Sequence, residues 1–144
     1  RDISSAIRTE ACGIMASKVA ANMAVRAALL ACQRAFRKLP GLVADGRDMG
    51  TVVFPDAALK FFITASYEAR AERRFHQLQG SENHASLNKI MQDMVERDAR
   101  DMNRQIAPLA AADNAILIDT TKLGIDEVMR QVMDYVNKSI KLAP

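Results

Sequence analysis

The sequence predicts an α/β fold in which helices flank a parallel sheet. Three short apolar runs, at residues 42–44, 59–64 and 115–119, have the length and the bounding turn residues of strands. Longer segments with helical periodicity separate them. This alternation is typical of parallel sheets, because parallel strands need long crossover connections. Three strands are few for such a sheet, which indicates that part of it is missing.

The composition is that of a globular protein with enough chain for one domain. The 144 residues are 49% hydrophobic and 26% charged. No apolar run approaches the ~20 residues of a membrane span, and no secretory signal is visible, so we expect no membrane partner. Cys12 and Cys32 lie in Ala-rich helical stretches and are expected to be buried free thiols, which predicts a cytoplasmic protein. The net charge of +3 fits nucleic acid or small phosphorylated ligands.

The stretch from Thr9 to Leu39 predicts two helices that break near Asn22 and end at the following Pro-Gly pair. Ser17 and Arg26 look like ordinary surface positions of these helices, and Arg34 is expected to point outward. One side of the second helix is apolar and is expected to be buried: Val25, Leu29, Leu30 and Cys32.

The loop after the first predicted strand is the most informative part of the chain. Residues 45–50 hold two aspartates, one arginine and two glycines. In open α/β sheets ligands bind at the carboxyl ends of the strands. Glycine permits tight turning, so backbone amides and Arg47 can close on an anion. The alternative is a surface loop in which Arg47 pairs with Asp45 or Asp48.

A helix is predicted after the second strand, with Ser66 as its cap and Glu68 in its first turn. It carries Arg70, Arg73 and Arg74, which either bind phosphate or form a solvated face. Residues 79–85 are polar and rich in helix breakers, so we expect a mobile linker.

A long helix is predicted from Ser86, and its apolar stripe turns ionic toward its end. The stripe consists of Leu87, Ile90, Met91 and Met94. At ~100° per residue it continues to Arg97, Asp101 and Arg104. Buried charges need partners or an anionic ligand. The alternative is an Arg97–Asp101 pair on a solvated helix end, which contributes little.

The last predicted helix covers residues 124–141 and follows the third strand. Its expected buried face repeats at helical spacing: Ile125, Val128, Val132, Val136 and Ile140.

Two motifs give the chain a resemblance to bacterial cytidylate kinases, which are nucleoside monophosphate kinases of the P-loop superfamily. They are Ala-Asp-Gly-Arg-Asp-Met-Gly-Thr-Val-Val-Phe-Pro at 44–55, and Glu-Arg-Asp-Ala-Arg-Asp at 96–101 with Asn103-Arg104. Shorter matches lie at Ile7-Arg8-Thr9, Ala107-Pro108-Leu109 and Ile118-Asp119-Thr120-Thr121. The resemblance covers essentially the whole chain.

One departure from the family is large. The family opens with a strand and a Gly-rich loop of the form G-x-x-x-x-G-K-[ST], and none of the six glycines here fits that pattern. The chain therefore resembles the carboxyl-terminal part of such a kinase, a P-loop nucleoside monophosphate kinase fold whose amino-terminal strand and P-loop are missing. The resemblance implies three parts: residues 1–40 from the CMP-binding insertion, residues 41–66 and 105–144 from the core, and residues 67–104 as the lid and the helix after it.

The implied activity is transfer of the ATP γ-phosphoryl group to CMP or dCMP, with Mg²⁺ accompanying ATP and the intact enzyme a monomer. This chain alone is expected to be inactive, because the loop that holds the donor phosphates is absent. The alternative is a phosphate-binding or nucleic-acid-binding module without catalysis. Nucleic acid is not expected, because few aromatic residues accompany the arginines.

The resemblance also implies roles for individual residues. Those expected to contact the cytosine edge are Ser17, Arg26 and Asp48, and Asp101 is expected to contact the ribose. The arginines expected to hold the CMP phosphate and assist catalysis are Arg47, Arg97 and Arg104. Asp45, at the end of a predicted buried strand, would hold Mg²⁺ through water. Arg70, Arg73 and Arg74 fall in the lid and would meet the donor phosphates.

Overall fold

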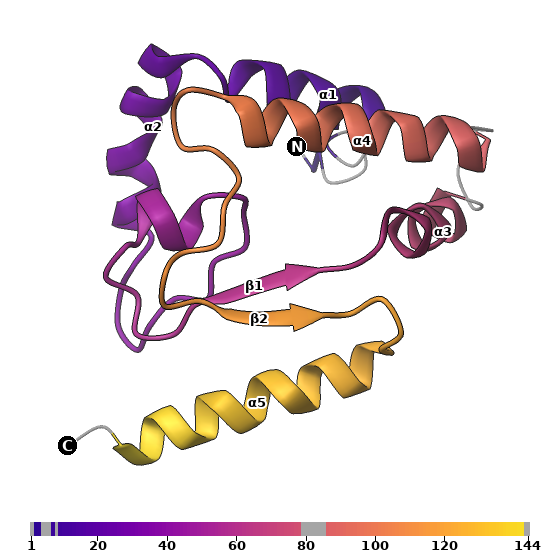
Figure 1. Ribbon diagram of the computed structural model, residues 1–144. Coiled ribbons are helices and arrows are strands. Elements are labelled where there is room, and N and C mark those ends of the chain that lie inside the picture. Colours follow the sequence, from indigo (N-terminus) through magenta and orange to yellow (C-terminus); the bar gives the residue numbers. More distant parts are fainter. Residues whose placement is uncertain (1, 4–6, 8, 79–85, 143–144) are drawn as a thin grey trace. The chain divides into compact units, whose positions relative to one another are not determined.

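The computed structural model describes residues 2–3, 7, 9–78 and 86–142 (Figure 1). The predicted linker at 79–85 lies outside the described residues. The chain forms two compact units. We call residues 1–55 and 96–110 the helical unit, and residues 56–95 and 111–144 the sheet unit. Each is described by itself below.

Helices make up the helical unit, and polar side chains set where they begin. The elements are α1 (Glu10–Val19), α2 (Met23–Ala35), the single π-helical turn η2 (Met49–Val53) and the last part of α4 (Leu87–Asn103). The Thr9 side chain caps α1 by accepting from the amide of Cys12 at 3.2 Å. The Asn22 side chain caps α2 by accepting from the amides of Ala24 and Val25. The predicted break near Asn22 is thus confirmed.

The predicted strand at 42–44 is wrong. These residues have no regular secondary structure, and Val43 is 100% exposed. A strand persists only where a neighbour pairs with its backbone. Among the described residues β1 and β2 pair only with each other, so residues 42–44 have no pairing partner.

The apolar side of α2 is also more open than predicted. No residue of α2 is fully buried, and Leu29 is 51% exposed. The turn η2 packs against α2 but is only five residues long, so it covers a small part of the helix. Both cysteines are free, as predicted, but Cys12 is half-buried and Cys32 is exposed. The amphipathic pattern of α2 is therefore present, but the prediction that its apolar side is buried is wrong.

The sheet unit contains a two-stranded parallel sheet with helices beside it, which confirms the α/β class. Its elements are β1 (Phe61–Thr64), α3 (Tyr67–Leu78), the first part of α4, β2 (Ile116–Asp119) and α5 (Ile125–Leu142). In the sheet Phe61 lies opposite Ile116, and Thr64 lies opposite Asp119. The second and third predicted strands are confirmed, with β1 beginning two residues later than expected.

The hydrophobic core of the sheet unit includes the predicted stripe of α4. Ile90 is 1% exposed and packs with Ala71 and Leu78 of α3, and Phe75, Met91 and Met94 border this cluster. Ser66 caps α3, because its hydroxyl accepts from the Ala69 amide at 3.2 Å. Leu87 is 38% exposed at the start of α4, where its helix has no preceding turn to cover it.

The helix α5 keeps its predicted place, with one correction to its buried face. Val128, Val132 and Val136 are half-buried, and the Tyr135 ring meets the Phe61 ring edge-on at 6.0 Å. Ile125 is 83% exposed, because it is the first residue of the helix.

Within the described residues, no one helix has the length and apolarity to cross a bilayer. Ala11–Val19 and Met23–Ala35 pass that test only as a pair bent by 99°, judged on length and composition alone.

Candidate functional site

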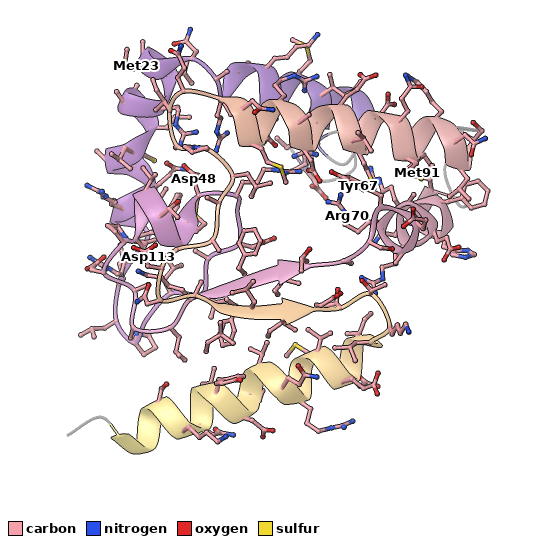
Figure 2. The ribbon with its side chains drawn as sticks, viewed as in Figure 1. Met23, Asp48, Tyr67, Arg70, Met91 and Asp113 are labelled. Atoms are coloured by element: carbon pink, nitrogen blue, oxygen red, sulfur yellow. The ribbon has the colours of Figure 1, made fainter. Side chains whose placement is uncertain are left out.

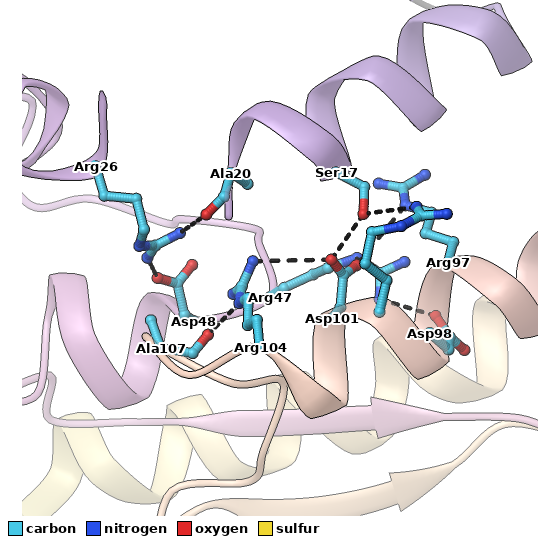
Figure 3. A network of polar contacts seen from close by, with 11 residues as sticks. Ser17, Ala20, Arg26, Arg47, Asp48, Arg97, Asp98, Asp101, Arg104 and Ala107 are labelled. Carbon is cyan, nitrogen blue, oxygen red and sulfur yellow. Dashed lines mark hydrogen bonds and ion pairs between the residues drawn. The ribbon is translucent and has the colours of Figure 1, made fainter. Parts of the chain in front are cut away.

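Asp101 is the centre of a polar cluster in the helical unit (Figure 3). It is 1% exposed, and the Ser17 hydroxyl donates to its Oδ1 at 2.9 Å. Arg47 Nε lies 2.9 Å from its Oδ2. Arg104 Nη1 and Arg97 Nε lie farther away, at 3.8 and 3.9 Å. A buried carboxylate needs such partners, since desolvation disfavours its charge. The alternative of a solvated pair at this helix end is therefore wrong for Asp101.

A second buried aspartate holds Arg47 from the other side. Arg47 Nη1 lies 2.9 Å from Asp98 Oδ1, and Asp98 is 3% exposed. Arg100 Nη1 donates to the Ser17 hydroxyl at 3.2 Å. We define the polar cluster as Arg47, Arg97, Asp98, Arg100, Asp101 and Arg104. Its four arginines and two aspartates leave an excess of two positive charges.

Helix geometry explains why these charges meet. The helix α4 continues unbroken to Asn103, so Asp98 and Asp101 lie three residues apart on neighbouring turns. The helix α1 contributes Ser17, and it comes close to α4 at Gly13. A Cβ atom at Gly13 would lie 3.1 Å from Arg97 Nη1. Glycine therefore leaves room for the Arg97 side chain against α1.

Arg104 is more deeply buried than Arg47 and Arg97, with 6% of its side chain exposed. Its Nε donates to the Ala107 carbonyl oxygen, while its Nη2 is buried and has no hydrogen-bond partner among the described residues. Buried donors are nearly always paired in folded proteins. The side chains of Arg47 and Arg97 are 30% and 36% exposed, so the cluster is open to solvent on one side. An anion could therefore reach it.

Asp48 and Arg26 form a separate ion pair at the start of η2 (Figure 3). Arg26 Nη2 donates to Asp48 Oδ2, and Arg26 Nη1 donates to the Ala20 carbonyl oxygen at 3.3 Å. The Arg26 side chain is only 18% exposed, and that of Asp48 is 10% exposed. Arg47 and Asp48 are adjacent in sequence, yet Arg47 turns to α4 and Asp48 turns to α2. The loop alternative, in which Arg47 pairs with Asp45 or Asp48, is not what the structure has.

The site residues expected from the resemblance are therefore brought together only in part. Arg47, Arg97, Asp101 and Arg104 share one cluster, as the helical stripe and the motifs predicted. Ser17, expected beside Arg26 and Asp48, instead bonds Asp101. The interpretation of Ser17 and Arg26 as ordinary surface residues is wrong, because both are largely buried and paired.

Asp45 does not lie at the end of a strand. It is exposed in the irregular segment before η2. Across residues 9–78 and 86–142, no three His, Cys, Asp or Glu side chains are grouped so that they could hold a metal ion. The role of Asp45 in holding Mg²⁺ through water stays a prediction.

The three arginines of α3 lie in the sheet unit, and the contacts of Arg73 there are with neutral oxygen atoms. Arg73 donates to the hydroxyl of Thr120 at 3.1 Å, to the carbonyl oxygen of Thr120, and to that of Leu123 at 3.4 Å. Arg70 lies over the Tyr67 ring, with Cζ 4.7 Å from its centre (Figure 2). Arg74 Nη1 lies 3.4 Å from Gln77 Oε1.

Three residues with structural roles near the site were missed by sequence reasoning. Asp98 had a signal, since it falls four residues after Met94 on the same helix stripe. Arg100 had none. Arg34 is exposed, as expected, but its Nε and Nη2 also donate to the carbonyl oxygens of Val53 and Val52 at 3.0 and 3.1 Å.

Comparison with known proteins gives the family of the chain. The family model described as cytidylate kinase matches residues 1–138. A cytidylate kinase of Shewanella sp. (strain MR-7) is 52% identical over 142 residues, which are 99% of this chain and 62% of that protein. The cytidylate kinase of Shewanella oneidensis is 52% identical over 96% of this chain and 60% of its own length. The chain thus spans about three-fifths of the curated relatives it matches, and it belongs to the cytidylate kinase family.

Proposed function

We propose that this chain carries the nucleoside monophosphate site of a kinase that transfers the ATP γ-phosphoryl group to CMP or dCMP. The observation that carries this proposal is the buried, unpartnered Nη2 of Arg104 within a cluster that has two positive charges in excess. That cluster lies in the helical unit, together with the Arg26–Asp48 pair.

The phosphate of CMP is the ligand that the polar cluster fits best. A phosphate monoester carries about two negative charges near neutral pH, which matches the excess charge of the cluster. Guanidinium groups bind phosphate oxygens through two parallel N–H donors. Arg47, Arg97 and Arg104 would supply them, while Asp98 and Asp101 keep the arginines in place.

The Arg26–Asp48 pair suits the base of the same ligand. Cytosine offers an amino donor to a carboxylate and acceptor atoms to a guanidinium. Asp48 would accept from the amino group, and Arg26 would donate to the ring. Asp101 would contact the ribose, and Ser17 reaches the ligand through Asp101 rather than beside Arg26.

The reaction needs no covalent intermediate on the protein. An oxygen of the CMP phosphate attacks the γ-phosphorus of ATP, the bond from that phosphorus to the β–γ bridging oxygen breaks, and ADP leaves. The arginines of the cluster would position the attacking phosphate and offset the repulsion between the two phosphates. Mg²⁺ would accompany ATP and neutralise part of its charge. The division into insertion, core and lid, with Arg70, Arg73 and Arg74 in the lid, remains a prediction.

None of the six glycines belongs to a donor-phosphate loop, so we expect this 144-residue chain to bind CMP without catalysing phosphoryl transfer. Robust kinase turnover by the purified chain would contradict that expectation. The rival function is a nucleic-acid-binding module that uses its arginines on backbone phosphates.

Calorimetric titration of the chain with CMP and with a short single-stranded RNA, at several salt concentrations, separates the two functions. The proposal predicts saturable binding of CMP, with RNA no tighter per site. Tight RNA binding that falls steeply with salt, without any preference for free CMP, would favour the rival and overturn the proposal.

A further inference from the structure

The π-helical turn η2 has Asp48 at its start and is too short to be stable through its own hydrogen bonds. Its amides at Val52 and Val53 donate to the Asp48 carbonyl oxygen, and Phe54 donates to that of Met49. The last carbonyl groups of any helix have no partner within it. Single π turns are rare and frequently occur at functional sites. Something outside η2 must therefore bind its final carbonyl groups.

Arg34 of α2 does this. Its Nε donates to the Val53 carbonyl oxygen at 3.0 Å, and its Nη2 donates to that of Val52 at 3.1 Å. Val53 is itself 2% exposed, so its carbonyl has little access to water. The two donors of one planar guanidinium fix both carbonyl groups at once.

The same helix holds the opposite end of η2. Arg26 precedes Arg34 by eight residues, which is about two turns, so both side chains leave α2 on neighbouring faces. Arg26 donates to the Asp48 carboxylate at the start of η2. The position of Asp48 relative to Arg26 therefore depends on how η2 sits against α2, and Arg34 determines that at the far end.

We propose that Arg34 is a positioning residue for base selection, a role that rests on the proposed function of Asp48 and Arg26. With η2 held in place, the Asp48 carboxylate presents an acceptor where cytosine has its amino group. Uracil has a carbonyl oxygen at that position, which a carboxylate repels. Loosening η2 lets Asp48 move away from this position. Discrimination between CMP and UMP then falls, while the polar cluster still holds the phosphate of either nucleotide.

Arg34→Met tests the inference, because methionine keeps much of the side-chain length and loses both donors. Lys38→Met is the matched control, since it removes one positive charge at an exposed position four residues away. Both variants and the unchanged chain are titrated with CMP and with UMP. Exchange of the Val52, Val53 and Phe54 amides with deuterium is followed in the same samples.

Arg34→Met is expected to weaken CMP binding about tenfold, the loss typical of a charge-assisted hydrogen bond, and to change UMP binding less than twofold. The three amides should exchange faster. Arg34→Lys keeps the charge but not the planar pair of donors, so its CMP affinity should lie between those of Arg34→Met and the unchanged chain. It also provides a second variant if Arg34→Met does not fold.

An unchanged ratio of CMP to UMP affinity in Arg34→Met, equal to that of Lys38→Met, overturns the role of Arg34 and leaves the proposed function intact. Failure of the unchanged chain to bind CMP overturns the proposed function itself, and the role of Arg34 with it. The two failures are thus distinguished by the unchanged chain alone.

Discussion

Arg47 of the helical unit and Arg73 of the sheet unit meet different kinds of partner. In the helical unit Arg47 lies between the carboxylates of Asp98 and Asp101, both at least 97% buried. In the sheet unit Arg73 donates to a hydroxyl and to backbone carbonyl groups after β2. Carboxylates can hold several arginines together at once, while neutral oxygens hold a single arginine in place.

We interpret the polar cluster as a ligand site and the contacts of Arg73 as structural because of this difference. The polar cluster gathers four arginines around two aspartates and keeps an excess of positive charge, which an anionic ligand would complete. Arg73 ties α3 to the loop after β2 through neutral oxygen atoms.

Removal of Asp101 should have the largest effect on stability. Asp101→Ala leaves Arg47, Arg97 and Arg104 without their shared buried carboxylate, and breaking a buried pair lowers the free energy of unfolding by roughly 3–5 kcal/mol. Urea unfolding measures the loss. The matched control is Asp93→Ala, because Asp93 pairs on the same helix with Lys89, whose side chain is 58% exposed, at 2.7 Å. That control should lose under about 1 kcal/mol, and equal losses would contradict the contrast.

Asp98→Asn should weaken the hold on Arg47 while keeping the side-chain shape. CMP affinity is expected to fall about fivefold, equivalent to roughly 1 kcal/mol. The affinity for cytidine should stay the same, because the phosphate contact alone is disturbed. Calorimetry with both ligands checks this. An equal loss for cytidine would mean that Asp98 supports the fold and not the phosphate contact.

In the sheet unit, Arg73→Met should cost stability without affecting the monophosphate. Loss of its hydrogen bonds to Thr120 and Leu123 is expected to lower the free energy of unfolding by about 1 kcal/mol. CMP affinity should remain within twofold of the unchanged chain. A larger drop in CMP affinity would show that Arg73 belongs to the ligand site, and the contrast between the two units would fail.

The smallest effect concerns the acid response of the loop after β2. The hydroxyl and the amide of Thr121 donate to Asp119 at 2.6 and 2.8 Å and hold the pKa of that carboxyl below its ordinary value of 3.8. A lowered folded-state pKa contributes stability above pH 3.8, which is lost as the pH falls through the folded-state value. Thr121→Val should raise the Asp119 midpoint in an NMR titration, and Thr51→Val should leave it unchanged. An unmoved midpoint in Thr121→Val would contradict this.

Local signals in the sequence predicted most elements of the fold. The break at Asn22, the Ser66 cap of α3, and the strands β1 and β2 depend on residues close in sequence, and all are confirmed. The stripe of α4 is confirmed except for Leu87, which is exposed. The segment at 42–44 failed for the opposite reason. Its apolar residues satisfy a strand pattern, but a strand also needs a pairing partner, and none of the described strands pairs with it.

The site divides along the same line. Arg97, Asp101 and Arg104 could be predicted because one helix presents them on one face. The bond from Ser17 to Asp101 joins residues 84 positions apart, and the Arg26–Asp48 pair joins residues 22 apart. No local pattern contains such pairings. The resemblance to cytidylate kinases grouped Arg26 with Asp48. It also placed Ser17 with these two residues instead of with Asp101.

The affinity of the chain for CMP relative to cytidine, before and after Arg104→Met, tests whether the polar cluster binds the phosphate of CMP. Arg104 Nη2 is buried and has no hydrogen-bond partner among the described residues, so we expect the unchanged chain to prefer CMP by about tenfold or more. We also expect Arg104→Met to remove most of this preference, with cytidine binding unchanged. Equal affinity for CMP and cytidine in the unchanged chain, or a preference that survives Arg104→Met, would contradict the account.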